Sequence, residues 1–236
     1  MPQDRTRERK LDSFILKRMD YGEADQIITL FTREEGKVRA LVKAAKLPTS
    51  KLQPMLQPLF QTRVNLTGSR DSAGLSKVTG VQLICSYSGV LADETKLNAW
   101  FVVSELMMRA LPDQAPNEKL FDEFKSYAQF LHDTDLTSGQ VKQSVIQFQI
   151  KALASLGLAI RAHQPEGNLW FSMDRGGFIT EEGALDAIPI RQPVFKSFQV
   201  LSEHSYNRGA TLEGDEMGTL AGLVNRFVIH QSERHI

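Results

Sequence analysis

Residues 13–43, SFILKRMDYGEADQIITLFTREEGKVRALVK, predict a β-meander. Three short runs rich in large apolar and β-branched residues, 13–19, 26–32 and 37–43, are separated by turn-forming residues. Side chains alternate between the two faces of a strand, so the third run divides into two sets. One face carries Val38, Ala40 and Val42, and the other carries Lys37, Arg39, Leu41 and Lys43. We therefore expect one face of this strand to be core and the other to be largely cationic.

Two more strands are predicted further along, at 59–66 and 76–84. The connection over 46–58 contains three prolines and predicts a short helical turn around 51–56. Five strands with a helical insertion between the third and fourth match the order of the oligonucleotide-binding (OB) barrel. An SH3-like barrel also has five strands, and only the strand pairing separates the two. We predict an OB-fold nucleic-acid-binding domain over residues 1–86.

Residues 87–236 predict a mainly α-helical domain, which makes the chain α+β. Apolar residues recur at helical spacing in 93–111, 117–131, 141–156, 193–204 and 216–232. In the first of these they lie on more than one side, which predicts a buried helix. Residues 169–179 predict a small β-hairpin around Asp174-Arg175-Gly176-Gly177.

Charge is segregated along the chain. There are 28 basic and 28 acidic residues in all, but residues 1–80 hold 15 basic and 9 acidic ones. Between Glu35 and Asp71 there is no carboxylate, and the seven basic residues there are Lys37, Arg39, Lys43, Lys46, Lys51, Arg63 and Arg70. Clustered Lys and Arg release counterions condensed on a phosphate backbone, so this stretch indicates a polyanionic partner. A solvated basic face is the alternative.

Several classes of function lack their signatures. The sequence has no phosphate-binding loop of the Gly-x-x-x-x-Gly-Lys-Ser/Thr type and no His-Glu-x-x-His pair. Its single cysteine, Cys85, lies in an apolar context that predicts a buried residue. The charged amino terminus and the lack of a long apolar run lead us to expect no membrane partner and a cytoplasmic protein. We expect neither an enzyme nor a bound cofactor or metal.

Several motifs carry a family resemblance. The run 15–32, continued by Glu35-Gly36-Lys37-Val38, resembles the amino-terminal signature of RecO, a family of bacterial recombination mediators. Further matches to the family are Lys43-Ala44-Ala45-Lys46, Ser50-Lys51-Leu52, Gln57-Pro58, Leu111-Pro112, Leu120-Phe121 and Leu156-Gly157. Many members carry a four-cysteine zinc site after that last pair, but residues 158–236 contain no cysteine. The chain resembles a zinc-less member, with the hairpin as the metal-free equivalent.

The resemblance implies a mediator that binds single- and double-stranded DNA and anneals complementary strands. It also implies two protein partners, RecR and the acidic, apolar-ended tail of single-stranded DNA-binding protein (SSB), with which it would help load recombinase onto SSB-coated strands. Candidate DNA contacts are Lys17, Arg18, Tyr21, Lys37, Arg39, Lys43, Lys46, Lys51 and Arg63. Candidates for a tail pocket are Lys125, Lys142 and Lys151, for which ordinary helix-surface lysines are the alternative. The rival functions are an OB-fold RNA-binding or translation-associated protein and a non-catalytic adaptor for an acidic protein.

Overall fold

The computed structural model describes residues 8–68, 75–162, 168–180, 184–206 and 214–234. The chain forms two compact units. The first joins Met1–Leu91 with Ser104–Phe121, and the second joins Ala92–Val103 with Asp122–Ile236. The predicted domain boundary after residue 86 stays a prediction, because the first unit also takes in residues 104–121.

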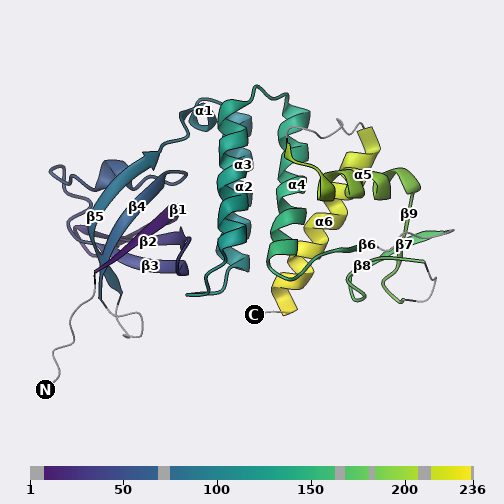
Figure 1. The fold of residues 1–236 in the computed structure, drawn as a ribbon, viewed down its shortest axis with the longest axis horizontal. Helices are drawn as coiled ribbons and strands as arrows, with labels where there is room; N and C mark the ends of the chain where they lie inside the picture. The colour runs from purple at the N-terminus through teal and green to yellow at the C-terminus, as the bar shows by residue number, and fades with distance from the viewer. Residues whose placement is uncertain (1–7, 69–74, 163–167, 181–183, 207–213, 235–236) are drawn as a thin grey trace, which may run out of the picture. The chain divides into compact units, whose positions relative to one another are not determined.

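The first unit contains a closed five-stranded barrel (Figure 1). Its strands are β1 (Arg9–Tyr21), β2 (Asp25–Thr32), β3 (Gly36–Val42), β4 (Gln61–Thr67) and β5 (Ser76–Cys85). They close in the order β1-β2-β3-β5-β4, because β1 pairs with both β2 and β4 and β3 pairs with β5 in parallel. This order confirms the predicted OB-fold. The predicted helical turn is the 3-10 helix η1 (Gln53–Met55) between β3 and β4.

The barrel is filled by aliphatic side chains that alternate along its strands. They include Leu11, Ile15, Ile28, Leu30, Val38, Ala40, Val42, Val64, Leu66 and Val78. Phe14 and Phe31 follow the opposite alternation, so they lie on the outer face, where both contact Phe121 with ring centroids 5.5 and 5.3 Å apart. Both phenylalanines are fully buried.

All the predicted helices are present. They are α2 (Glu94–Ala110), α3 (Glu118–Asp133), α4 (Ser138–Ser155), α5 (Gln192–Glu203) and α6 (Gly214–Arg234), and a short α1 (Ser88–Leu91) precedes them. Asn117 caps α3 by accepting the Leu120 N–H at 3.0 Å, and Thr137 forms a capping box with Gln140 at the start of α4. The predicted buried helix, α2, is covered on only part of its surface: Trp100 and Met107 are buried, but Phe101 and Val102 are 51% and 47% exposed.

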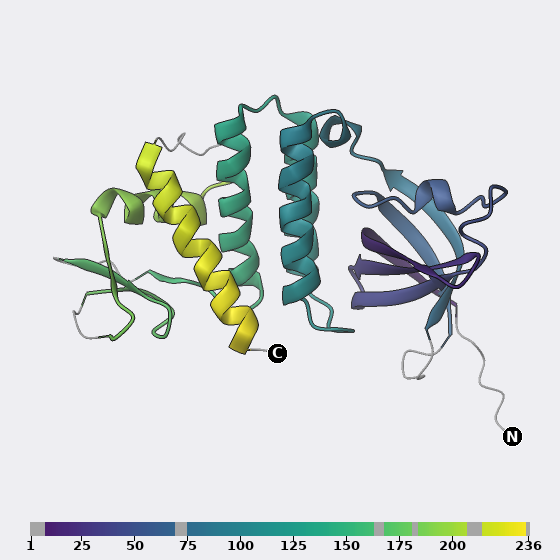
Figure 2. The ribbon, with the colours of Figure 1, turned by 180° about the vertical axis from the view of Figure 1, so that it is seen from behind.

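The second unit also carries a small sheet in the order β6-β8-β7-β9. Its strands are β6 (Arg161–Ala162), β7 (Leu169–Ser172), β8 (Gly177–Ile179) and β9 (Ile188–Ile190). The predicted hairpin is β7 and β8, while β6 and β9 were missed because two or three residues show no period. Phe171, Phe178, Phe195, Phe198 and Phe227 join this sheet to α5 and α6 in one apolar cluster. Helix α6 packs obliquely against α4 in the same unit (Figure 2).

Neither a metal site nor a membrane-spanning helix emerges from the part of the chain that the structure describes. Within it, no three His, Cys, Asp or Glu side chains gather closely enough to hold an ion. None of the described helices combines the length and the apolar character that crossing a bilayer needs.

Candidate nucleic-acid interface

The outer face of strands β1, β2 and β3 is arranged in rows. Residues paired across neighbouring strands point to the same side of a sheet, so the register defines which side chains lie next to each other. Each row holds one residue from each strand, in the order β1, β2, β3. The first row contains the two residues that contact Phe121 and is Phe14–Phe31–Lys37, and the following rows along the strands are Lys17–Thr29–Arg39, Met19–Ile27–Leu41 and Tyr21–Asp25, the last without a β3 member. The first row is packed against the helical part of the unit, and the other three form the candidate face.

A β-bulge brings Lys17 onto this face. The register between β1 and β2 shifts between Ile15 and Lys17, so Leu16 is the extra residue. Strict alternation would place Lys17 on the same side as Ile15, which lies in the barrel interior. The bulge turns Lys17 outward instead, where it is exposed and stands in line with Thr29 and Arg39.

Lys17 and Arg39 are the cations of the face that keep their charge available. They lie two strands apart, which places their Cα atoms roughly 10 Å from each other. Both are exposed, and neither forms a hydrogen bond or ion pair with any residue that the structure describes. These two side chains can therefore meet phosphates without first losing a protein partner.

The next row, together with Tyr21 of the row after it, is apolar or aromatic and partly open to solvent. Met19 is 45% exposed and Tyr21 is 54% exposed, whereas Ile27 is 5% exposed and lies between Met19 and Leu41. An aromatic ring and an aliphatic strip beside cations suit the bases of a single strand, since every base has an apolar face. The face thus offers contacts for bases as well as for the phosphates that the sequence emphasised.

Two predicted contacts, Lys43 and Lys46, are paired with aspartates. Lys43 Nζ lies 2.9 Å from Asp25 Oδ2, and Lys46 Nζ lies 3.1 Å from Asp20 Oδ2. The Ala44 N–H and Lys43 lower the pKa of Asp25, while the Gln26 amide and Lys46 lower the pKa of Asp20. Both carboxylates are therefore ionised near neutral pH.

Arg63 is also paired, on the side of the barrel formed by β1 and β4. It makes a two-pronged contact with Asp12, Nε to Oδ1 at 2.5 Å and Nη2 to Oδ2 at 3.1 Å, which raises the pKa of Arg63. Lys51 is exposed and has no bonding partner within the described ranges. Arg70 lies outside the described residues.

Lys37 and Arg18 do not point into the candidate face. Lys37 donates to the Met108 carbonyl at 3.1 Å and pairs with Asp113 at 3.2 Å, leaving 16% of its side chain exposed. Arg18 is paired with Ile28, an interior residue, and is half-buried. Its Nη1 atom is buried without a hydrogen-bond partner in the described part of the chain.

Lys77 is a cation next to the face that the sequence did not single out. It is exposed on β5 and stands opposite Leu41 in the parallel pairing of β3 with β5. Its outward direction could have been read from the alternation of Ser76 and Val78, which are buried. Its position beside the candidate face could not have been read from the sequence, because only the strand pairing brings β5 next to β3.

Comparison with known proteins places this barrel in a family. The family model described as "Recombination protein O N terminal" matches residues 7–87. The DNA repair protein RecO of Bacillus subtilis (strain 168) is 30% identical over 194 residues, which cover 78% of this chain and 72% of that protein. This chain belongs to the RecO family.

Other RecO proteins match to different extents. The DNA repair protein RecO of Myxococcus xanthus is 24% identical over 239 residues, 95% of this chain and 93% of that protein. The one from Geobacter metallireducens is 35% identical over 122 residues, which span 52% of this chain and 49% of that protein. The matched RecO model contains the whole candidate face but not Met108 or Asp113, which hold Lys37.

The lysines predicted for partner binding in this RecO protein lie on helices α3 and α4. Lys125 and Lys142 are exposed. Lys151 is largely covered, with its ammonium 3.5 Å from Glu123 and 4.7 Å from the ring centroid of Tyr206. Recognition of an acidic tail by these residues stays a prediction.

Proposed function

We propose that this protein is a DNA-binding recombination mediator that binds single- and double-stranded DNA and anneals complementary strands. Membership of the RecO family supports a function in DNA repair and recombination. The observation that carries the proposal is the pair of available cations, Lys17 and Arg39, beside the exposed Met19 and Tyr21.

The proposed annealing needs no reaction chemistry. Two complementary strands repel each other through their phosphates, and a cationic surface offsets that repulsion while counterions are released. Phosphates held on Lys17 and Arg39 leave the bases of one strand against the apolar row, from which they can pair with an incoming strand. Watson–Crick pairing then provides the driving force, so we propose a non-enzymatic function without a bound cofactor.

We extend the proposal to protein partners. In it, RecR and the tail of SSB cooperate with this protein in loading recombinase onto SSB-coated strands at the nucleoid. Of the three lysines predicted for an acidic tail, Lys125 and Lys142 are exposed, whereas Lys151 already has Glu123 and Tyr206 as partners.

The proposed function is tested by annealing of labelled complementary oligonucleotides, both bare and coated with SSB. We expect the Lys17→Glu, Arg39→Glu double variant to lose binding and annealing. The dependence of log affinity on log salt should flatten by about 0.7 for each single-strand phosphate that the variant no longer neutralises. The control is Lys196→Glu with Arg226→Glu, which makes the same change in charge at two exposed positions of the other unit.

The two variants separate local contacts from total charge. Annealing that is lost in the barrel variant and kept in the control supports the proposal. Equal annealing rates for all three proteins would overturn it. Stronger competition by RNA than by DNA of the same sequence would instead favour the RNA-binding alternative.

A further inference from the structure

Two aspartates flank the β1–β2 turn and hold the two lysines of the segment Lys43-Ala44-Ala45-Lys46. Asp25, at the start of β2, pairs with Lys43, and Asp20, near the end of β1, pairs with Lys46. The backbone is joined at the same place, because the Lys46 N–H donates to the Ala24 carbonyl at 2.9 Å. The segment that follows β3 is thus fastened to the turn that carries Tyr21.

These ion pairs lie at the surface. The side chains of Asp20 and Lys43 are each 63% exposed, Lys46 is 33% exposed, and Asp25 is the most covered of the four at 19%. Water screens such pairs, so each contributes little net free energy and its cation can change partner at small cost. A phosphate oxygen offers a lysine the same charge-assisted hydrogen bond that the carboxylate does.

We propose that Asp20 and Asp25 are internal competitors for DNA phosphates. Without DNA, their carboxylates form ion pairs with the ammonium groups of Lys43 and Lys46. In the complex, DNA phosphates replace the carboxylates as partners of the two lysines. This inference rests on the proposed function, since it concerns the regulation of the same surface. Its consequence is selectivity, because a ligand with several adjacent phosphates displaces both carboxylates together and an isolated anion displaces only one.

The same two aspartates also weaken the hold on bound DNA. Once displaced, each carboxylate stays beside the phosphates that replaced it, and like charges at that distance repel. A protein that brings strands together and leaves the duplex behind benefits from such moderated affinity.

The charge of the aspartates can be removed without removing their hydrogen bonds. Asp25 Oδ1 accepts the Ala44 N–H at 2.8 Å, and Asp20 Oδ1 accepts the Gln26 amide at 3.0 Å. An asparagine carbonyl can accept both bonds. The Asp20→Asn, Asp25→Asn variant therefore keeps the turn in place and frees the two lysines.

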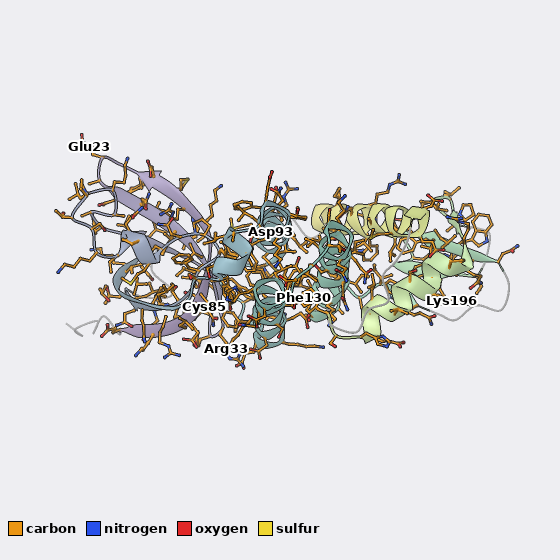
Figure 3. All side chains as sticks on the ribbon, turned by 90° about the horizontal axis from the view of Figure 1, so that it is seen from above. Glu23, Arg33, Cys85, Asp93, Phe130 and Lys196 are labelled. Carbon is orange, nitrogen blue, oxygen red and sulfur yellow. The ribbon has the colours of Figure 1, made fainter. Side chains whose placement is uncertain are left out.

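Glu23 provides a matched control in the same turn. It is exposed, it forms no ion pair within the described residues, and Figure 3 shows it at the tip of the turn with its side chain directed away from the barrel. Glu23→Gln removes one negative charge from the same neighbourhood without freeing a lysine. Asp20→Asn and Asp25→Asn each remove one negative charge as well, so each single variant can be compared directly with Glu23→Gln.

The test is binding of labelled oligothymidylate to the full-length protein and its variants, followed by fluorescence anisotropy. We expect Asp20→Asn with Asp25→Asn to bind roughly 2- to 30-fold more tightly than wild type, the range that two surface ion pairs span. Glu23→Gln should bind nearly as wild type does. In a Lys43→Gln, Lys46→Gln background the two asparagines should bring no gain, and circular dichroism confirms that each variant is folded.

The outcomes separate this inference from the proposed function. Wild-type binding without any gain in the asparagine variant overturns the inference alone. An equal gain in Glu23→Gln, or a gain that persists without the two lysines, overturns it too, because it indicates general repulsion. Failure of the wild-type protein to bind DNA at all removes the proposed function and the inference with it.

Discussion

Lys37 on strand β3 forms an ion pair with Asp113 in the loop between α2 and α3, with Nζ 3.2 Å from Oδ1. The backbone reinforces this contact, because the Gln114 N–H donates to the Lys37 carbonyl at 3.0 Å. The lysine that the charge pattern assigned to DNA is therefore held by protein groups in the DNA-free protein. We infer that it fastens this loop to the barrel, and its contact with DNA stays a prediction.

Substitution of Lys37 should mainly lower stability, whereas substitution of Arg39 should mainly weaken DNA binding. Lys37→Met keeps an apolar stem but removes two bonds, so the free energy of unfolding should fall by about 1 to 3 kcal/mol. Arg39→Ala should leave stability within about 0.5 kcal/mol and weaken DNA binding. Urea unfolding and fluorescence anisotropy measure the two effects. A Lys37→Met protein of normal stability that no longer binds DNA would contradict this assignment.

Gly36 should tolerate a methyl group less well than Gly22. Both have positive φ, +71° and +62°, where alanine costs about 1 to 2 kcal/mol. A Cβ atom at Gly36 would also lie 2.1 Å from the Ala115 carbonyl oxygen, whereas one at Gly22 meets nothing within 4 Å. We expect Gly36→Ala to lower the free energy of unfolding by at least about 1 kcal/mol more than Gly22→Ala does. Equal decreases in urea unfolding would show that the close approach does not matter.

The contribution of Asp25 to stability should depend on pH. Its pKa lies below the ordinary 3.8 because the folded protein offers it the Ala44 N–H and Lys43. A carboxyl group with a lowered pKa stabilises the fold above its unfolded pKa, and that contribution disappears as the pH falls through the folded value. Asp25→Asn should therefore be less stable than wild type at about pH 7, and the difference should shrink as the pH falls through the lowered pKa of Asp25. A difference in urea midpoint that stays constant over this range would rule out the ionised carboxylate as its source.

Removal of metal ions should leave the second unit intact. The sheet of β6, β7, β8 and β9 is held by aromatic packing, with Phe178 4.9 Å from Phe195 and 5.0 Å from Phe171 between ring centroids. Thermal unfolding before and after dialysis against a chelator should give the same Tm, whereas Phe178→Ala should lower the free energy of unfolding by about 3 to 5 kcal/mol. A lower Tm after chelation, with zinc found in the untreated protein, would disprove the metal-free assignment.

The sequence predicted the barrel well because its strands are long enough to show alternation and their turns contain characteristic residues. The helical spacing of apolar residues likewise predicted α3 and α4, although the predicted range 141–156 omits the first residues of α4, which Thr137 caps. Prediction from sequence did not extend to β6 and β9, which are too short to have a period. It named both Lys17 and Arg18 as DNA contacts but could not tell which of the two points outward, because a bulge reverses the alternation without leaving a mark in the sequence.

The charge pattern along the chain was a partial guide to the charge pattern in space. Residues 36–70 contain no carboxylate, yet Lys37, Lys43, Lys46 and Arg63 each have an aspartate within hydrogen-bonding distance. Those carboxylates come from β1, β2 and the loop after α2. Strand pairing and loop packing, rather than sequence distance, decide which cations remain available, so Arg39 emerged as a stronger candidate than Lys37.

The close approach of Gly36 to Ala115 limits where domains can be exchanged between related proteins, in evolution or in the laboratory. The barrel that matches the family model ends at residue 87, but its β2–β3 turn fits a loop well beyond that point. If the barrels of two relatives were exchanged at that boundary, the β2–β3 turn of one protein would have to pack against the α2–α3 loop of the other. The smallest transferable module therefore includes residues 104–121. Position 36 should stay glycine whatever residue stands at 115, because the atoms that it approaches belong to the backbone.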